Sequence, residues 1–248
     1  MTRFWQFLDS SRFGRLLVPK SSETALRVSI GILGMTLAPA VWFLGTVFGN
    51  MSLLPSVSDY YHTNARDLFV GVLFLMGAFQ ISYRGHQRAD DLITWATGIL
   101  ALGIATFPCT PVDSLVPASG RVGAFQLCLK TSGILHLISA FSFFLLASFY
   151  ILFFFRRGKA DPSREKWRKN LVFLLCGCGM LAVLAGITAV VAIKGKAFMD
   201  QPGALFFPEC ALLLFFGIAW LVKANVVPGL IDPPSSLESS VRYQVRSE

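Results

Sequence analysis

The residues best suited to chemistry stand near the ends of three apolar segments. Asp67 opens one of these segments, His136 lies about one helical turn into another, and Glu209 follows Pro208 near the start of a third. Imidazole and carboxylate groups are normal zinc ligands, and metal-bound water can attack esters and amides. These three residues are therefore candidate metal ligands with zinc as the cofactor, and His62 is a fourth candidate.

Three neighbouring polar residues extend this candidate metal site into a pocket. Ser139 lies three residues after His136, on the same side of a helix. Tyr61 and Arg66 precede Asp67 closely in the chain. We expect all of these side chains, together with Glu209, to line one outward-facing polar pocket that binds a membrane lipid or a small amphiphile. This pocket is the first functional hypothesis.

Each candidate also has a structural explanation. Glu209 near a helix N-terminus is favoured by the helix macrodipole. His136 can hydrogen-bond between helices. Asp67 can cap its helix or pair with Arg66, and Tyr61 suits an anchor at the membrane interface. The residues alone do not decide between these explanations and a binding site.

Two further function classes remain open beside lipid binding. One is a metal-dependent membrane lipid hydrolase, an amidase or esterase, and the other is a structural subunit of a membrane complex. A Ser–His–Asp arrangement could use Ser58 or Ser139 as nucleophile, but neither serine stands in a nucleophile-elbow pattern. No Asp, Glu, Lys or Arg occupies the middle of an apolar segment, which argues against an ion-coupled transporter. Nucleic acid is not an expected partner, because the basic residues lie in short runs between apolar segments.

The composition indicates that helices in a membrane must position these residues. Hydrophobic residues make up 54% of the 248, and charged residues only 15%, against about 25% in soluble domains. A helix that crosses about 30 Å of hydrocarbon needs roughly 20 apolar residues. We predict an all-α fold, a polytopic membrane protein with a bundle of six transmembrane helices. The predicted spans are Val28–Phe48, Asp67–Tyr83, Leu92–Pro108, Gly133–Phe155, Leu171–Ile193 and Ala204–Val222.

The basic residues predict the orientation of these spans. With the N-terminus inside, 17 of the 22 Lys and Arg residues fall on the cytoplasmic side and 5 on the other. We therefore expect both termini in the cytoplasm. The predicted parts are a basic leader (1–27), a six-helix transmembrane domain (28–223) and a disordered cytoplasmic tail (224–248). The leader is either a segment lying on the inner membrane face or a disordered one.

The cysteines divide between a loop and the apolar segments. Cys109 and Cys128 both fall in the loop between the third and fourth spans, on the predicted outer side. An oxidising compartment would permit a disulfide between them, although two free thiols are the alternative. Cys176, Cys178 and Cys210 lie within spans and are expected to pack between helices.

Several short motifs resemble those of small bacterial integral-membrane proteins with six helices. The likeness lies in Ser56–Tyr61, Arg66–Gly71, Tyr83–Gly85 and Ala105–Pro108, and His136 resembles the fourth-helix histidine of that group. The chain is also loosely similar to the DRAM/FRAG-type six-helix membrane proteins. The resemblance implies a six-helix bundle in the bacterial inner (plasma) membrane and implies no particular activity.

A more distant likeness is to the membrane hydrolases of the alkaline ceramidase superfamily. Those enzymes use a serine, an aspartate and several histidines around a metal, and here Ser58, Asp67 and His136 are the only candidates for that set. The paired histidines of that family's last helix have no counterpart, because Glu209 stands there instead. This departure weakens the implied metal site.

Overall fold

The computed structural model describes residues 21–85, 87–111, 121–157 and 164–230. Within these ranges the chain is almost entirely helical, as predicted. Six long elements are α3 (Ser22–Val47), α4 (Arg66–Ser82), α5 (Arg88–Thr106), α6 (Leu129–Phe149, extended by the π-helix η2, Tyr150–Phe155), α7 (Arg164–Lys194) and α9 (Phe206–Lys223). The short elements are the 3-10 helix η1 (Ser58–His62), helix α8 (Lys196–Met199) and a hairpin of β1 (Arg121–Val122) and β2 (Leu127–Cys128).

Four of these helices are long and apolar enough to cross a membrane, among the residues that the structure describes. They are α3, α6 with η2, α7 and α9. Helix α4 has only 17 residues, and the 19 residues of α5 begin with Arg88, Asp90 and Asp91 in the first turn. The all-helical prediction is confirmed, and four of the six predicted spans meet the length and composition of a membrane-crossing helix.

Local capping explains why α3 begins before the apolar segment does. The Ser21 hydroxyl accepts a hydrogen bond from the Thr24 amide at 3.2 Å, and Glu23 stands in the first turn, where a negative charge is favoured. The helix therefore starts six residues before the predicted Val28. This extension places Arg27 in the second turn of α3.

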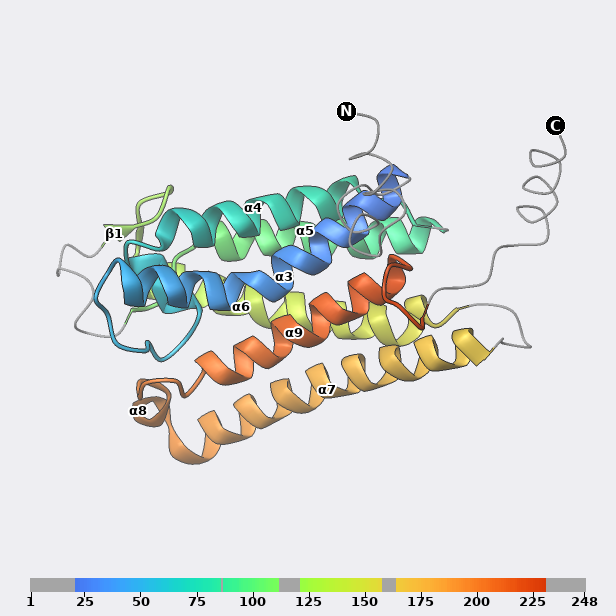
Figure 1. Cartoon of the computed structure of the whole chain (residues 1–248). Coiled ribbons are helices and arrows are strands. Elements are labelled where there is room, and N and C mark those ends of the chain that lie inside the picture. The colour runs from blue at the N-terminus through green and yellow to red at the C-terminus, as the bar shows by residue number, and fades with distance from the viewer. Residues whose placement is uncertain (1–20, 86, 112–120, 158–163, 231–248) are drawn as a thin grey trace, which may run out of the picture.

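The six long helices form a closed ring. Each packs against the next in the order α3, α4, α5, α6, α7 and α9, and α9 returns to α3. Figure 1 shows the helices running side by side, with α7 tilted away at the end that carries α8. The ring encloses a core of large apolar side chains that includes Phe143, Phe216 and Trp220. Hydrogen-bonded backbones therefore surround a continuous apolar interior.

Pairs of glycines set the two close helix contacts. A Cβ on Gly77 of α4 would lie 2.9 Å from the Gly98 carbonyl oxygen, and one on Gly98 of α5 would lie 2.7 Å from the Gly77 carbonyl oxygen. Gly31 of α3 and Gly217 of α9 face each other in the same way, with distances of 3.0 and 2.6 Å. Because small residues let backbones approach, these contacts resemble those between membrane helices.

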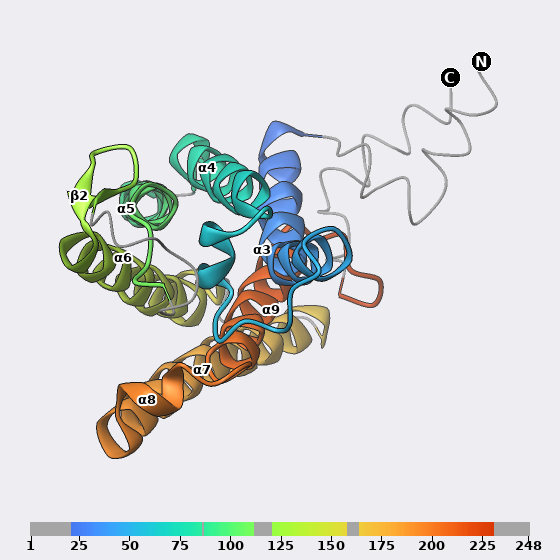
Figure 2. The same ribbon diagram turned by 90° about the vertical axis from the view of Figure 1, so that its left-hand side faces the viewer.

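The two ends of the ring differ in character. At the end we call the η1 end, η1, the β-hairpin and α8 cover the helix termini (Figure 1). Viewed from there, η1 lies between α3, α4 and α6, where it occupies the mouth of the ring (Figure 2). At the end we call the basic end lie the start of α3, the α4–α5 turn and the end of α9 (Figure 1). Both ends carry polar clusters.

Candidate functional sites at the two ends of the bundle

The segment that contains η1 is fixed by its own hydrogen bonds. The Asp59 carboxylate accepts from the Ser56 amide at 3.0 Å and from the Ser56 hydroxyl at 2.7 Å, and the Asp59 amide donates to the Ser56 hydroxyl at 3.0 Å. Asp59 is 5% exposed, and burial raises the pKa of its carboxyl group while the Ser56 bonds oppose that rise. Reciprocal bonds of this kind hold the short helix in one conformation.

His136 joins this segment to the end of α5. Its Nδ1 atom lies 2.7 Å from the Phe107 carbonyl oxygen, and its Nε2 atom lies 3.0 Å from the Ser58 hydroxyl. A carbonyl oxygen can only accept, so Nδ1 carries the proton and Nε2 accepts from Ser58. The ring is 5% exposed. A neutral imidazole with its lone pair directed at a serine hydroxyl is therefore built into this end.

Glu209 holds the residue next to Ser58. Its Oε2 atom accepts a hydrogen bond from the Val57 amide at 2.7 Å. His136 and Glu209 thus bind adjacent residues of one segment. What they share is the segment of residues 57 and 58, beside a narrow space of about 40 Å³ that Ser58 and Glu209 line.

The other predicted pocket residues lie elsewhere. The Arg66 guanidinium donates to the Tyr61 hydroxyl at 3.1 Å and lies 4.8 Å from the centre of its ring. With Asp67, these two residues line a groove of about 570 Å³ beside the β-hairpin. Ser139 faces α5, where a Cβ on Gly103 would lie 2.6 Å from its hydroxyl. The residues predicted to line one pocket therefore lie in three separate environments, which corrects that prediction.

The predicted metal ligands are likewise not brought together. Among the described residues, no three His, Cys, Asp or Glu side chains approach one another closely enough to hold a metal ion. Asp67 lines the groove outside η1, while His136 and Glu209 hold η1 from the inside. The zinc site with His136, Asp67 and Glu209 as ligands is corrected accordingly.

The predicted disulfide is not formed. Cys109 and Cys128 are both free thiols. The Cys109 thiol donates to the Ser58 carbonyl oxygen at 3.2 Å, and burial raises its pKa well above the usual value. The Cys128 sulfur lies 2.9 Å from the Thr131 hydroxyl at the exposed start of α6. Cys109 packs against η1 instead of reaching the hairpin.

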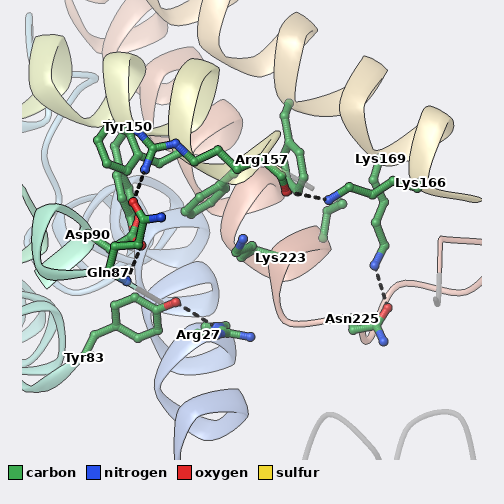
Figure 3. Close-up of a pocket in the computed structure, with 14 residues that line it drawn as sticks. Arg27, Tyr83, Gln87, Asp90, Tyr150, Arg157, Lys166, Lys169, Lys223 and Asn225 are labelled. Atoms are coloured by element: carbon green, nitrogen blue, oxygen red, sulfur yellow. Dashed lines mark hydrogen bonds between the residues drawn. The ribbon is translucent and has the colours of Figure 1, made fainter. Parts of the chain in front are cut away.

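The basic end contains a cavity of about 420 Å³ that sequence reasoning did not single out. Five cationic side chains and one carboxylate stand among its lining residues. These are Arg27 of α3, Arg157 after η2, Lys166 and Lys169 of α7, Lys223 of α9, and Asp90 of α5. Figure 3 shows them directed into a common space from opposite walls. The cavity is therefore strongly electropositive.

Hydrogen bonds hold the cations on the walls of this basic cavity. Arg27 donates to the Tyr83 hydroxyl at 3.1 Å, and Arg157 donates to the Gln87 amide oxygen at 2.9 Å. Lys169, only 4% exposed, donates to the side-chain oxygen of Asn225 at 2.7 Å. These contacts fix the positions of the charges before any ligand arrives.

Lys223 differs from the other cations. Within the described part of the chain, its ammonium group makes no hydrogen bond or ion pair, and it lies 5.1 Å from the centre of the Phe155 ring. Arg27, Lys166 and Lys169 are all within electrostatic range of it. Figure 3 shows the ammonium between Arg27 and Arg157 with no dashed line. Its ammonium group therefore lines the cavity with no hydrogen-bond partner among the described residues.

The floor of the basic cavity is aromatic because α6 ends in a π-helix. Tyr150, Phe154 and Phe155 belong to η2 and line the cavity together with Phe173 of α7. A π-helical turn places one more residue on the same length of helix than an α-helix does, and such turns recur at functional sites. Here it brings three aromatic side chains under the cations.

The sequence contained the basic residues but no sign of their convergence. Arg157, Lys166 and Lys169 belong to one basic stretch, whereas Arg27 and Lys223 stand near opposite ends of the helical region. The counting rule that predicted the orientation used all five as cytoplasmic charges. Only the closed ring brings the start of α3, the end of α6, the start of α7 and the end of α9 to one cavity.

Comparison with known proteins gives no further guide to the function of either end. No protein-family model, no curated protein and no solved structure matches the chain. Function is therefore inferred from the geometry of the two ends.

Proposed function

We propose that this chain is a six-helix integral membrane protein whose basic cavity binds the anionic headgroup of a membrane lipid. Both termini lie in the cytoplasm in this proposal, and the membrane is the bacterial inner membrane implied by the resemblance to small six-helix proteins. The predicted ligand class, a lipid or amphiphile, is kept. Its place moves from the η1 end to the basic end.

The outer faces of α4 and α5 support six spans rather than four. Phe74 and Leu75 of α4 are 45% and 50% exposed, and Leu92 and Trp95 of α5 are 65% and 50% exposed. Apolar side chains on the outside of a ring that already has an apolar core suit contact with lipid. The charged first turn of α5 lies at the basic end, where a membrane helix meets the aqueous interface.

The single observation that carries the ligand proposal is the imbalance of charge in the basic cavity. Five cations and one carboxylate line the cavity, and Glu23 pairs with Arg27 at 2.9 Å, so positive charges remain in excess there at reduced dielectric. A phosphate group supplies both the counter-charge and the acceptor oxygens that Lys and Arg donors bind well. Basic clefts between transmembrane helices on the cytoplasmic side are recognised sites for anionic headgroups.

Size and polarity favour an amphiphile over a bare ion. A volume of about 420 Å³ is within the usual range of small-molecule pockets, roughly 300–1,000 Å³. The aromatic floor from η2 offers an apolar surface beside the cations. A phosphate with attached glycerol or a similar polar group therefore suits the cavity, and its acyl chains would remain with the surrounding lipid.

The test compares two lipids with identical acyl chains and different headgroup charge. We expect phosphatidylglycerol to raise the thermal midpoint of the detergent-purified protein, and phosphatidylcholine to leave it nearly unchanged, because ligands that bind only the folded state stabilise it. Each cation contributes about 1 kcal/mol near an anionic headgroup. Lys223→Met should therefore weaken the lipid's apparent affinity about fivefold, and Lys223→Met with Arg157→Gln about 25-fold.

A cation at the other end serves as the matched control. Arg66→Gln removes one positive charge at the η1 end and should leave the lipid response unchanged. Equal stabilisation by both lipids, or an equal loss in Arg66→Gln, would overturn the proposal. Stabilisation by glycerol phosphate alone, without any response to the lipid, would assign the cavity to a soluble phosphate compound instead.

A further inference from the structure

The pair of Ser58 and His136 at the η1 end has the arrangement of a nucleophile and its base. The Ser58 hydroxyl donates to His136 Nε2 over 3.0 Å, and the Phe107 carbonyl oxygen fixes the proton on Nδ1 at 2.7 Å. The imidazole is therefore held in the tautomer that can accept a proton from Ser58. In a catalytic triad a carboxylate fixes the base in this way, and here a backbone carbonyl does so.

Ser58 is presented to a cavity on a rigid segment. Glu209 holds the Val57 amide, and the Asp59–Ser56 bonds fix the other side of Ser58. Ser58 and Glu209 line a narrow space of about 40 Å³ whose other walls are mainly apolar, including Phe143 and Leu213. Such a space can hold a water molecule, since about 10–15 Å³ of this kind of volume suffices for one.

The hydrogen bond from His136 to the loop after α5 does not by itself explain why a histidine stands at this position of α6. Ser132, one turn earlier on α6, already ties the same loop to the helix by donating to the Pro108 carbonyl oxygen at 2.9 Å. His136 adds a second hydrogen bond to this loop, from Nδ1 to the Phe107 carbonyl oxygen. Its Nε2 atom accepts from the hydroxyl of Ser58, which lines the cavity. That second bond gives the serine a base.

We propose that Ser58 is an acyl-accepting nucleophile and His136 its general base, in an esterase or acyl-transfer reaction on slim acyl esters. The space of about 40 Å³ restricts the acyl group that it can admit to a short one. This activity is separate from headgroup binding at the basic end, and neither proposal depends on the other.

The reaction balances with water as the second substrate. A bond forms between Ser58 Oγ and the ester carbonyl carbon, and the Ser58 proton passes to His136 Nε2. The bond from carbon to the alcohol oxygen then breaks, and His136 gives the proton to the departing alkoxide. Water next attacks the acyl-serine, its proton passes through His136 to Ser58 Oγ, and the free carboxylic acid leaves. Another alcohol in place of water would complete an acyl transfer.

The experiment uses a fluorescent alkyl fluorophosphonate on the full chain in detergent micelles. We expect stoichiometric phosphonylation with loss of fluoride, located at Ser58 by peptide mass spectrometry. Ser58→Ala should abolish labelling, and His136→Gln should slow it about 100-fold or more, the usual contribution of a general base. Ser132→Ala loses a loop anchor but not the pair, so it should be labelled like the wild type.

A second variant keeps the proposal testable if Ser58→Ala fails to fold. Ser58→Cys retains a nucleophile of similar shape, and the introduced thiol should react with chloroacetamide faster than the exposed Cys128 does. Adding His136→Gln should remove that advantage. An unlabelled wild type, labelling that persists in Ser58→Ala, or an introduced thiol in Ser58→Cys that reacts no faster than Cys128 would each show that the pair is structural only.

Discussion

The contact between Gly77 and Gly98 allows a quantitative test of whether α4 and α5 are full members of the bundle. In Gly98→Ala, the new Cβ would lie 2.6 Å from the Ile81 side chain and 2.7 Å from the Gly77 carbonyl oxygen. Ordinary van der Waals contact begins near 3.4 Å, so the two backbones must separate by about 0.7 Å. The obstacle is a backbone atom, which cannot rotate away.

The expected cost follows from two opposing effects. Overpacking of this kind costs about 1–3 kcal/mol, and alanine returns up to about 1 kcal/mol because it suits a helix better than glycine does. The net loss is therefore about 0–3 kcal/mol, and each kcal/mol corresponds to a fall of roughly 2–4 °C in thermal midpoint for a chain of this size. Gly71→Ala, on the partner helix α4 with nothing within 4 Å of its Cβ, should be unchanged or slightly stabilised.

The assay heats detergent-solubilised protein and measures the monodisperse fraction that remains by fluorescence-detected size-exclusion chromatography. Both variants are heated under one protocol, because membrane proteins unfold irreversibly and the midpoint depends on the heating rate. If Gly98→Ala matched Gly71→Ala within about 1 °C, the close approach of α4 and α5 would be refuted, and α4 and α5 would lose their place in the ring.

Two further predictions concern the η1 end. Glu209→Leu leaves the Val57 amide without its acceptor and should lower the free energy of unfolding by about 1–3 kcal/mol. Glu209→Gln keeps an acceptor and should cost less. Equal thermal midpoints for the two variants would contradict the role of this bond. His62 is predicted to make stability depend on pH, because burial lowers its pKa below the value of about 6.5 in the unfolded chain. Below that pH the unfolded state binds the proton more readily, so stability is full above about pH 6.5 and falls as the pH drops. Between about pH 7.5 and about pH 5.5, the thermal midpoint should fall more steeply for the wild type than for His62→Gln. Parallel curves of thermal midpoint against pH would exclude His62 as the source of the pH dependence.

The sequence by itself determined the class of fold. Uninterrupted apolar segments predicted the helices correctly, since apolar length and the need to satisfy backbone hydrogen bonds in lipid are local properties. The boundaries were less certain, because caps such as Ser21 extend helices beyond their apolar parts. The sequence also predicted His136 and Glu209 at one site, and both hold the segment that contains η1.

Tertiary structure decided which residues share a site. The rotation of each helix about its own axis cannot be read from a uniformly apolar segment, so Asp67 was predicted beside His136 although it lines a separate groove. Arg27 and Lys223 come together only because the ring closes between α3 and α9, the first and last long helices of the described part of the chain. Likewise, the short helix η1 turns Ser58 toward His136 across 78 positions of sequence, and no local pattern encodes a contact over that separation.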